Sequence, residues 1–208
     1  MNPDDLARWN ERYDRADYWF GTAPNAFLAA HRDLFRPGMS VLAVADGEGR
    51  NGVFLAGLGA EVLSVDASPV ALAKARRLAA ERGVALRTEL ADLASWTWPE
   101  ARFDAVVAIF IQFAPPELRG RLFASMQRAL KPGGLLLLQG YRPEQLAYGT
   151  GGPPHAENMY SADLLRHAFG DMEILHLREH DSEIREGIGH DGMSALVDLV
   201  ARRPMPPA

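Results

Sequence analysis

Blocks of apolar residues alternate with mixed blocks along the chain, and this alternation predicts strands and helices in turn. Residues 41–45 and 103–109 are almost wholly apolar, as in strands buried on both faces of a parallel sheet. Strands are expected over 41–45, 61–66, 84–90, 103–109, 135–138, 172–179 and 193–201. Helices are expected over 2–14, 24–34, 51–58, 69–82, 115–130 and 161–169. The pattern predicts an α/β fold: a doubly wound Rossmann-like sheet of seven strands, with helices on both faces and an antiparallel last strand in a terminal hairpin.

Short polar residues mark where several of these helices begin. Asn2, Ser68 and Ser161 each stand immediately before an expected helix. The side-chain oxygen of such a residue accepts a hydrogen bond from an otherwise unpaired backbone N–H of the first turn. We therefore expect all three to be N-caps.

Length and composition limit the class of protein. The 208 residues carry 48% hydrophobic residues, which suits one domain with a sizeable core. With no cysteine, the chain has no disulfide, thiolate nucleophile or cysteine-based metal site. A net charge of -5 disfavours nucleic acid and anionic membranes as partners. No apolar run is long enough to span a membrane, and no signal peptide is expected, so the sequence predicts a cytoplasmic protein.

A glycine-rich loop and two acidic residues follow the first three expected strands. Gly47, Gly49 and Gly52 come directly after the first strand, and Asp66 ends the second, 19 residues after Gly47. Such a loop lets a ligand approach the backbone, and a carboxylate at the next strand end can accept hydrogen bonds from ribose hydroxyls. Asp92 follows the third strand, where it can accept an adenine amine. Taken one at a time, the glycine loop is also consistent with a tight turn, Asp66 with a helix cap, and Asp92 with a solvated loop residue. The occurrence of all three features at the ends of three successive strands favours a nucleotide-containing cofactor.

The spacing of the three glycines also fits the dinucleotide fingerprint, so an NAD(P)-dependent reductase is one alternative. About 40 residues precede the first strand, whereas dehydrogenase domains of this size usually begin at it. The second half has no Tyr-x-x-x-Lys pair, and a Lys-Pro-Gly-Gly turn over 131–134 precedes the fifth strand. These features count against a nicotinamide cofactor.

Several short motifs carry a resemblance to a known family. They are the residues Trp9–Tyr13, Gly21–Asn25, Gly47–Asn51, Pro143–Leu146 with Gly151–Pro153, and Glu186–Gly187 with His190. With these motifs the chain resembles a class I S-adenosylmethionine-dependent methyltransferase, of a bacterial branch related to tellurite-resistance methyltransferases. The resemblance extends from about Trp9 to Val200. It implies a single domain over 1–208, with an N-terminal helical lid (1–36), a cofactor-binding core (37–141), and a substrate-side loop, helix and terminal hairpin (142–202).

The resemblance implies that S-adenosyl-L-methionine is the cofactor and which residues bind it. The implied set is Asp46, Gly47, Glu48, Gly49, Asn51, Asp66, Ala67, Asp92, Leu93, Ile109 and Gln112. The sequence departs from the family pattern at Ala43, where an acid is usual, and at Ala45, where a glycine is usual. Two interpretations of Asp46 stay open: it supplies the missing negative charge, or it caps the next helix.

Methyl transfer from a sulfonium is an in-line displacement in which the protein mainly positions the acceptor. An aromatic lid would exclude water and tolerate the sulfonium charge, and the candidates are Trp9, Tyr13, Tyr18, Trp19 and Phe20; ordinary packing of the N-terminal helix explains them equally well. The candidate catalytic residues are Tyr13, Tyr141, His155, Glu179, Glu183 and His190, each of which also suits a structural role. His176 and His180 fall on a strand, so no metal site is expected.

The predicted function is methyl transfer to a small-molecule acceptor, such as a thiol or a selenium or tellurium oxyanion. The alternatives are the NAD(P)-dependent reductase and a non-catalytic S-adenosylmethionine-binding protein. The acceptor, the use of a general base and the oligomeric state are not specified by the sequence.

Overall fold

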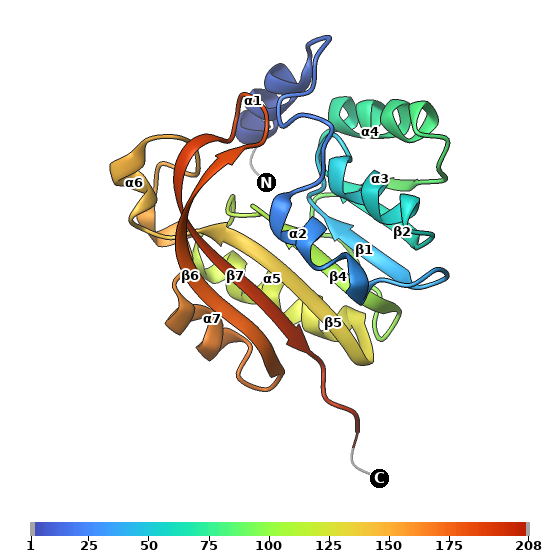
Figure 1. The fold of residues 1–208 in the computed structure, drawn as a ribbon, viewed down its shortest axis with the longest axis vertical. Helices are drawn as coiled ribbons and strands as arrows, with labels where there is room; N and C mark the ends of the chain where they lie inside the picture. Colours follow the sequence, from blue (N-terminus) through green and yellow to red (C-terminus); the bar gives the residue numbers. More distant parts are fainter. Residues whose placement is uncertain (1–2, 207–208) are drawn as a thin grey trace. The chain divides into compact units, whose positions relative to one another are not determined.

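The computed structural model describes residues 3–206, and the expected cap at Asn2 lies outside the described residues. Its strands form a seven-stranded sheet in the order β3-β2-β1-β4-β5-β7-β6 (Figure 1), which confirms the predicted fold class. The chain divides into two compact units. Unit 1 runs to Thr97 and includes Glu186–Gly189; unit 2 comprises Trp98–Arg185 and the residues from His190 onward. The predicted division into lid, core and substrate side stays a prediction.

Unit 1 contains three parallel strands and the helices that pack against them. Its elements are α1 (Pro3–Tyr13), α2 (Ala26–Ala30), the 3-10 helix η1 (Arg32–Leu34), β1 (Ser40–Val44), α3 (Arg50–Gly57), β2 (Glu61–Asp66), α4 (Pro69–Glu81) and β3 (Arg87–Leu90). Strand β2 pairs in parallel with β1 and β3. Helix α3 packs against β1 and β2, α4 packs against β2 and β3, and α1 packs on α4. The Ser68 hydroxyl caps α4, as predicted.

The second expected helix, 24–34, is broken into α2 and η1. Asn25 caps α2 by accepting a hydrogen bond from the Leu28 N–H. The helix ends at His31, where the backbone N–H donates to the Leu28 carbonyl (3.1 Å) and the imidazole Nδ1 lies 2.9 Å from the Phe27 carbonyl oxygen.

Unit 2 contains the remaining four strands. Its elements are β4 (Phe103–Ile109), α5 (Pro116–Ala129), β5 (Leu130–Tyr141), α6 (Gln145–Tyr148), the 3-10 helix η2 (Ala156–Asn158), α7 (Ala162–Ala168), β6 (Glu173–Arg185) and β7 (Asp191–Arg202). Strand β4 is parallel to β5, and β7 is antiparallel to both β5 and β6. Helix α5 packs against β4 and β5, and α7 packs against β6. Ser161 caps α7, as predicted.

One boundary in unit 2 differs from the expectation. The Lys-Pro-Gly-Gly segment was expected as a turn between helix and strand, but β5 already begins at Leu130. Leu130 has extended backbone angles and pairs with Phe103, and the register then shifts between Phe103 and Ala105. The irregular residues are held because the Gly133 N–H donates to the Arg203 carbonyl and the Arg203 N–H donates to that of Gly134. The helix therefore passes directly into an irregular strand.

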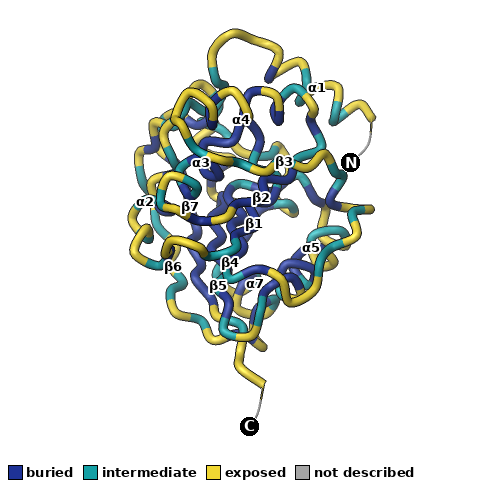
Figure 2. The backbone as a smooth tube through the Cα atoms, turned by 90° about the vertical axis from the view of Figure 1, so that its right-hand side faces the viewer, coloured by how far each residue is buried: buried dark blue, intermediate teal, exposed yellow. Residues whose placement is uncertain are grey.

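Burial follows the strands, as Figure 2 shows for β1, β2, β4 and β5. The side chains of 41–44 in β1 are at most 2% exposed, and those of β4 include fully buried Ala105, Val106 and Ala108. Both strands were expected to be buried on two faces, which is confirmed. Among the described residues, none of the helices combines the length and apolar character that a membrane crossing requires.

Candidate active site

The glycine loop after β1 has the left-handed backbone conformation that its sequence suggests. Gly47 has φ 57° and Gly49 has φ 85°. Ala45 also has a positive φ, 46°, although an L-residue there is strained. The loop thus keeps the backbone conformation of a glycine at position 45, where the family resemblance leads one to expect glycine.

Asp66 joins the end of β2 to this loop. One carboxylate oxygen accepts a hydrogen bond from the Gly47 N–H (2.9 Å), and the other accepts one from the Ser68 N–H (2.8 Å). Burial raises the pKa of Asp66 above its ordinary value. Each carboxylate oxygen has a second lone pair, so Asp66 can still accept hydrogen bonds from ribose hydroxyls. The sequence pattern predicted that the glycine loop and Asp66 lie close together, and the hydrogen bond between Gly47 and Asp66 confirms it.

Asp46 occupies a slot between β2 and the start of α3. Its carboxylate accepts hydrogen bonds from the Ser64 hydroxyl (2.9 Å) and the Gly52 N–H (3.2 Å). Gly52 is in the first turn of α3, so the capping interpretation of Asp46 is supported by this geometry. Burial is the main reason that the pKa of Asp46 rises to about 7.

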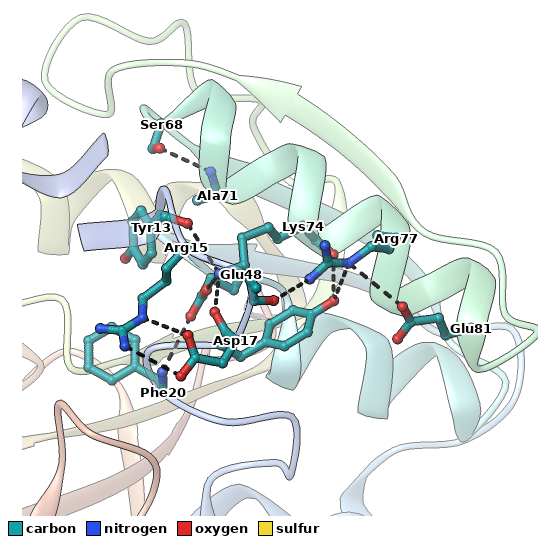
Figure 3. Close-up of polar contacts among 12 residues, drawn as sticks. Tyr13, Arg15, Asp17, Phe20, Glu48, Ser68, Ala71, Lys74, Arg77 and Glu81 are labelled. Atoms are coloured by element: carbon teal, nitrogen blue, oxygen red, sulfur yellow. Dashed lines mark hydrogen bonds and ion pairs between the residues drawn. The ribbon is translucent and has the colours of Figure 1, made fainter. Parts of the chain in front are cut away.

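Glu48 and Lys74 form a buried ion pair beneath the loop (Figure 3). Their side chains are 3% and 7% exposed. The Lys74 ammonium also donates to the carbonyl oxygens of Tyr13 (3.2 Å) and Asp17 (2.5 Å). The Glu48 side chain, an expected cofactor contact, is therefore committed to holding α4 and the segment after α1. The other Glu48 carboxylate oxygen accepts a hydrogen bond from the Phe20 N–H (3.3 Å).

Gly49 allows α4 to pack directly on the loop. A Cβ atom at position 49 would lie 2.5 Å from the Ala75 Cβ and 2.8 Å from its Cα. Both its positive φ and this contact require glycine.

Three of the five expected lid aromatics gather beside the loop. The Trp9 ring stacks on Tyr13 (centroids 5.5 Å apart), and Phe20 meets Tyr13 edge-on at 6.5 Å. A Cβ on Gly47 would lie 3.1 Å from the Tyr13 hydroxyl oxygen. Burial raises the Tyr13 pKa well above its ordinary value, and the nearby acids Asp66, Glu48 and Asp46 raise it further. Tyr13 is therefore placed as a neutral hydroxyl next to the loop.

The other two expected lid residues have different neighbours. Tyr18 packs against the apolar cluster of Val53, Leu78 and Ala79. Trp19 accepts a hydrogen bond at its carbonyl oxygen from the Gly189 N–H (3.2 Å). These two aromatics belong to the packing of unit 1.

Arg50 and Glu186 form a second buried ion pair in unit 1. The Arg50 Nη2 lies 2.6 Å from a Glu186 oxygen, and the two side chains are 7% and 9% exposed. Glu186 also accepts hydrogen bonds from the Asn25 side chain (3.1 Å) and the Ala26 N–H (3.0 Å). The Arg50 Nη1 is buried and has no hydrogen-bond partner among the described residues. A buried, unpaired guanidinium N–H suits an anionic group, such as the carboxylate of an amino-acid moiety.

Four further residues of unit 1 were predicted to bind the cofactor, namely Asn51, Ala67, Asp92 and Leu93. The Asn51 side chain accepts a hydrogen bond from the Asn25 N–H (2.9 Å), so it holds the start of α2. Ala67 directly follows Asp66 in the chain. After β3, Asp92 accepts a hydrogen bond from the Ala94 N–H (3.0 Å), and Leu93 is buried.

In unit 2, an aromatic cluster lies at the carboxyl ends of β4 and β5. The ring of Phe110 is 4.7 Å from Tyr141 and 4.3 Å from His190, and the Tyr141 and His190 rings are 5.6 Å apart. We call these three residues the aromatic cluster. Phe110 has φ 56°, a conformation that a bulky side chain adopts only under constraint and that often marks functional sites. The sequence suggested Tyr141 and His190 as catalytic candidates, and the resemblance placed the residues from Ile109 to Gln112 beside the cofactor, but the strained backbone of Phe110 has no sequence signal.

Gln112 positions Tyr141. Its side chain accepts a hydrogen bond from the Tyr141 N–H (2.6 Å) and donates one to the Tyr141 carbonyl (2.8 Å). A Cβ on Gly152 would lie 3.0 Å from the Tyr141 ring, so this glycine permits close approach. Gln112 was expected to contact the cofactor, and here both ends of its amide are used by Tyr141. Ile109, the other expected contact, is 9% exposed at the end of β4.

The other candidate catalytic residues have structural settings. Glu179 accepts a hydrogen bond from the Ala162 N–H (2.6 Å) at the start of α7. His155 and Glu183 have mainly exposed side chains. The His180 imidazole bridges Asp198 and Ser182, each at 2.8 Å.

Comparison with known proteins gives the class. The family described as "Methyltransferase domain" matches residues 41–134. A glycine/sarcosine N-methyltransferase of Parasynechococcus marenigrum is 29% identical over 199 residues, covering 81% of this chain and 67% of that protein. A demethylmenaquinone methyltransferase of Thermus thermophilus is 38% identical over 87 residues, covering 41% of this chain and 38% of that protein. This chain spans only 36% to 58% of the length of several further relatives.

Solved structures share the fold. A structure titled "Conversion of a Disulfide Bond into a Thioacetal Group during Echinomycin Biosynthesis" has a TM-score of 0.78 and 22% identity, covering 98% of this chain and 94% of that one. TehB from Haemophilus influenzae has a TM-score of 0.72 and 18% identity, covering 95% of this chain and 66% of that one. Together these matches support the predicted class, a class I S-adenosylmethionine-dependent methyltransferase, and imply S-adenosylmethionine as the cofactor. The matches favour S-adenosylmethionine over the nicotinamide alternative.

Proposed function

We propose that this protein methylates a small-molecule acceptor and that the acceptor is a soft nucleophile, a thiol or a related selenium or tellurium anion. The aromatic cluster of unit 2 carries this proposal. It lies at the carboxyl ends of β4 and β5, the edge at which open α/β sheets bind ligands. The structural neighbour whose title describes conversion of a disulfide to a thioacetal adds support, since that chemistry occurs at sulfur.

We infer that the cofactor is held by residues of unit 1. Asp66 would accept hydrogen bonds from the ribose hydroxyls, and the backbone from Gly47 to Gly49 would lie along the methionine moiety. The unpartnered Arg50 Nη1 fits the methionine carboxylate. S-adenosylmethionine supplies an activated methyl group on a sulfonium. Neutral Tyr13, held by Trp9 and Phe20, would exclude water beside the loop without adding a charge.

The aromatic cluster favours a reaction that removes charge. When an anionic acceptor forms its bond to the methyl carbon, the carbon–sulfur bond breaks and its electron pair stays on sulfur, so both opposite charges disappear. An apolar wall solvates separated charges poorly and dispersed charge better, and it therefore lowers the barrier for an anionic nucleophile. The Phe110 and Tyr141 rings supply such a wall.

His190 contributes the imidazole of the cluster, and imidazole is the most frequent general base in proteins. Its side chain is buried, with the residue 7% exposed, and it meets Phe110 edge-on. We propose that His190 accepts the proton when the acceptor arrives as a thiol rather than a thiolate. An acceptor that is already anionic needs no base.

The test is an acceptor panel assayed for S-adenosylhomocysteine and methylated product by mass spectrometry. Each thiol is paired with the alcohol and the amine of the same carbon skeleton, and selenite, tellurite, glycine and sarcosine complete the panel. Methylation of thiols or the chalcogen anions, with little of the alcohols and amines, is expected. Turnover of glycine or sarcosine alone would replace the soft acceptor with an amine. Binding of S-adenosylmethionine without any turnover would favour the non-catalytic alternative.

A second experiment tests the role of His190. His190→Gln should slow methylation of an alkyl thiol much more than that of a low-pKa aryl thiol, which is already ionised at pH 7. His155→Gln, at an exposed histidine, is the matched control and should leave both rates unchanged. Equal losses for both thiols in His190→Gln would show that His190 only supports the packing of Phe110 and Tyr141.

A further inference from the structure

The Asp46 carboxylate lies in a slot built from small residues. Ala43 of β1 pairs with Ser64 of β2, and the Ser64 hydroxyl donates to Asp46. A Cβ on Gly52 would lie 2.4 Å from an Asp46 carboxylate oxygen, so the third glycine of the motif makes room for this group. The slot therefore holds the Asp46 carboxylate close to Ser64, the residue that pairs with Ala43. Ala43 stands where the family pattern usually has an acid.

Asp46 has two neutral hydrogen-bond donors, and no residue of the described part of the chain forms an ion pair with it. The charged and titratable groups that face it are Asp66 from β2, Arg50 from α3 and Tyr13 from α1, and Glu48 of the loop lies beside Tyr13. Asp66 is a like charge. Arg50 is paired with Glu186, Glu48 is paired with Lys74, and Tyr13 is neutral. An ionised Asp46 is thus stabilised by its hydrogen bonds and by Arg50, whose charge Glu186 already partly compensates, until a cationic ligand arrives.

We propose that Asp46 makes the site select S-adenosylmethionine over S-adenosylhomocysteine by charge. This inference rests on the proposed function, in that it assumes the cofactor site lies at the glycine loop. The two ligands differ by one methyl group and one positive charge, the sulfonium. An ionised Asp46 beside the loop attracts the cationic substrate but gives the neutral-sulfur product no matching gain, so product leaves more readily.

The selectivity therefore depends on whether Asp46 carries its proton. Burial gives this carboxyl a pKa of about 7, so it is mostly protonated at pH 6 and mostly ionised at pH 8. For opposite charges several ångströms apart near a protein surface, the gain corresponds to a preference on the order of tenfold. Binding of S-adenosylmethionine near pH 7 should also release protons, because the cation favours the ionised form.

The experiment measures dissociation constants of both ligands by isothermal titration calorimetry at pH 6, 7 and 8. At pH 7 it is repeated in buffers of different ionisation enthalpy, which counts the protons released. In the wild type, the preference for S-adenosylmethionine should rise about fivefold from pH 6 to pH 8, because a small fraction of Asp46 is already ionised at pH 6. In Asp46→Asn the preference should be flat with pH, and proton release should be lost.

Ser64→Ala provides a second variant that keeps the carboxylate. Loss of the hydroxyl donor raises the pKa of Asp46, so the rise in preference should shift to higher pH while keeping its size. Asp163→Asn, which removes an exposed carboxylate on α7, should follow the wild type. A preference that varies with pH equally in the wild type and Asp46→Asn would overturn the inference alone. A wild type that does not bind S-adenosylmethionine would instead overturn the proposed function, and this inference with it.

Discussion

The buried ion pair between Arg50 and Glu186 makes a strong prediction for stability. Glu186 accepts hydrogen bonds from Arg50, from the Asn25 side chain and from the Ala26 N–H. Glu186→Ala removes all three acceptor contacts and leaves the Arg50 guanidinium buried without its carboxylate. Glu186→Gln keeps an amide oxygen as acceptor but removes the charge.

The size of the effect follows from burial. Breaking a buried ion pair by removing one partner costs about 3–5 kcal/mol, because the remaining charge is uncompensated. With both side chains less than 10% exposed, Glu186→Ala belongs in this range. Glu186→Gln should cost about 2–3 kcal/mol, since a hydrogen bond to a charged group contributes roughly 1.5–3 kcal/mol. For a protein of this length, 3–5 kcal/mol lowers the melting temperature by roughly 6–20 °C.

The assay is urea denaturation monitored by circular dichroism and tryptophan fluorescence. The matched control is Glu183→Gln, three residues earlier, where the ion pair with Arg185 is exposed and contributes only about 0–1 kcal/mol. Arg50→Met and the double variant Arg50→Met/Glu186→Gln complete a double-mutant cycle, whose coupling energy should exceed about 1 kcal/mol. A cost for Glu186→Gln no larger than that for Glu183→Gln would refute the argument from burial.

Three further predictions concern the glycine loop. Ala45→Gly should raise the free energy of unfolding by about 1 kcal/mol in chemical denaturation, because alanine at φ 46° is strained; a decrease would show that the strain is absent. Gly49→Ala should abolish binding of S-adenosylmethionine and destabilise the protein, since its Cβ would meet Ala75, whereas Gly57→Ala, at an open helical position, should be neutral or stabilising in the same assays. The folded-state pKa of Asp46 is raised to about 7, so the folded protein keeps a proton that the unfolded chain loses near pH 4. As the pH rises from about 4 to about 7, the free energy of unfolding of the ligand-free protein should therefore fall by up to about 4 kcal/mol. Asp46→Asn should lack this component, and parallel pH profiles for the two proteins would contradict it.

The sequence predicted the parts of the fold that depend on local pattern. Strand β4 was expected at 103–109 and lies there, because a strand buried on both faces must be apolar at every position. The link between Gly47 and Asp66 was also predicted, since parallel strands bring their carboxyl ends to one edge of the sheet. The N-caps at Ser68 and Ser161 were found from residue type alone.

Features that depend on contacts between distant segments were not predicted. Helix α2 ends early where the His31 N–H donates to Leu28 in a tighter turn, a change that helix periodicity does not encode. Glu48 looked like a cofactor contact because of its place in the motif, yet it pairs with Lys74 of α4. The positive φ of Phe110 and the amide of Gln112 on the Tyr141 backbone require the whole of unit 2 around them.

The composition of unit 1 has a consequence for the order of events during synthesis. Arg50 and its partner Glu186 are separated by 136 residues, and the unit is completed by the four residues Glu186–Gly189. A ribosome that adds 5–20 residues per second needs roughly 7–27 s to bridge that interval. During this interval, Arg50 and the first turn of α2 lack the Glu186 carboxylate to which both later donate hydrogen bonds. Unit 1 can therefore reach its final state only after residues 186–189 have emerged from the ribosome.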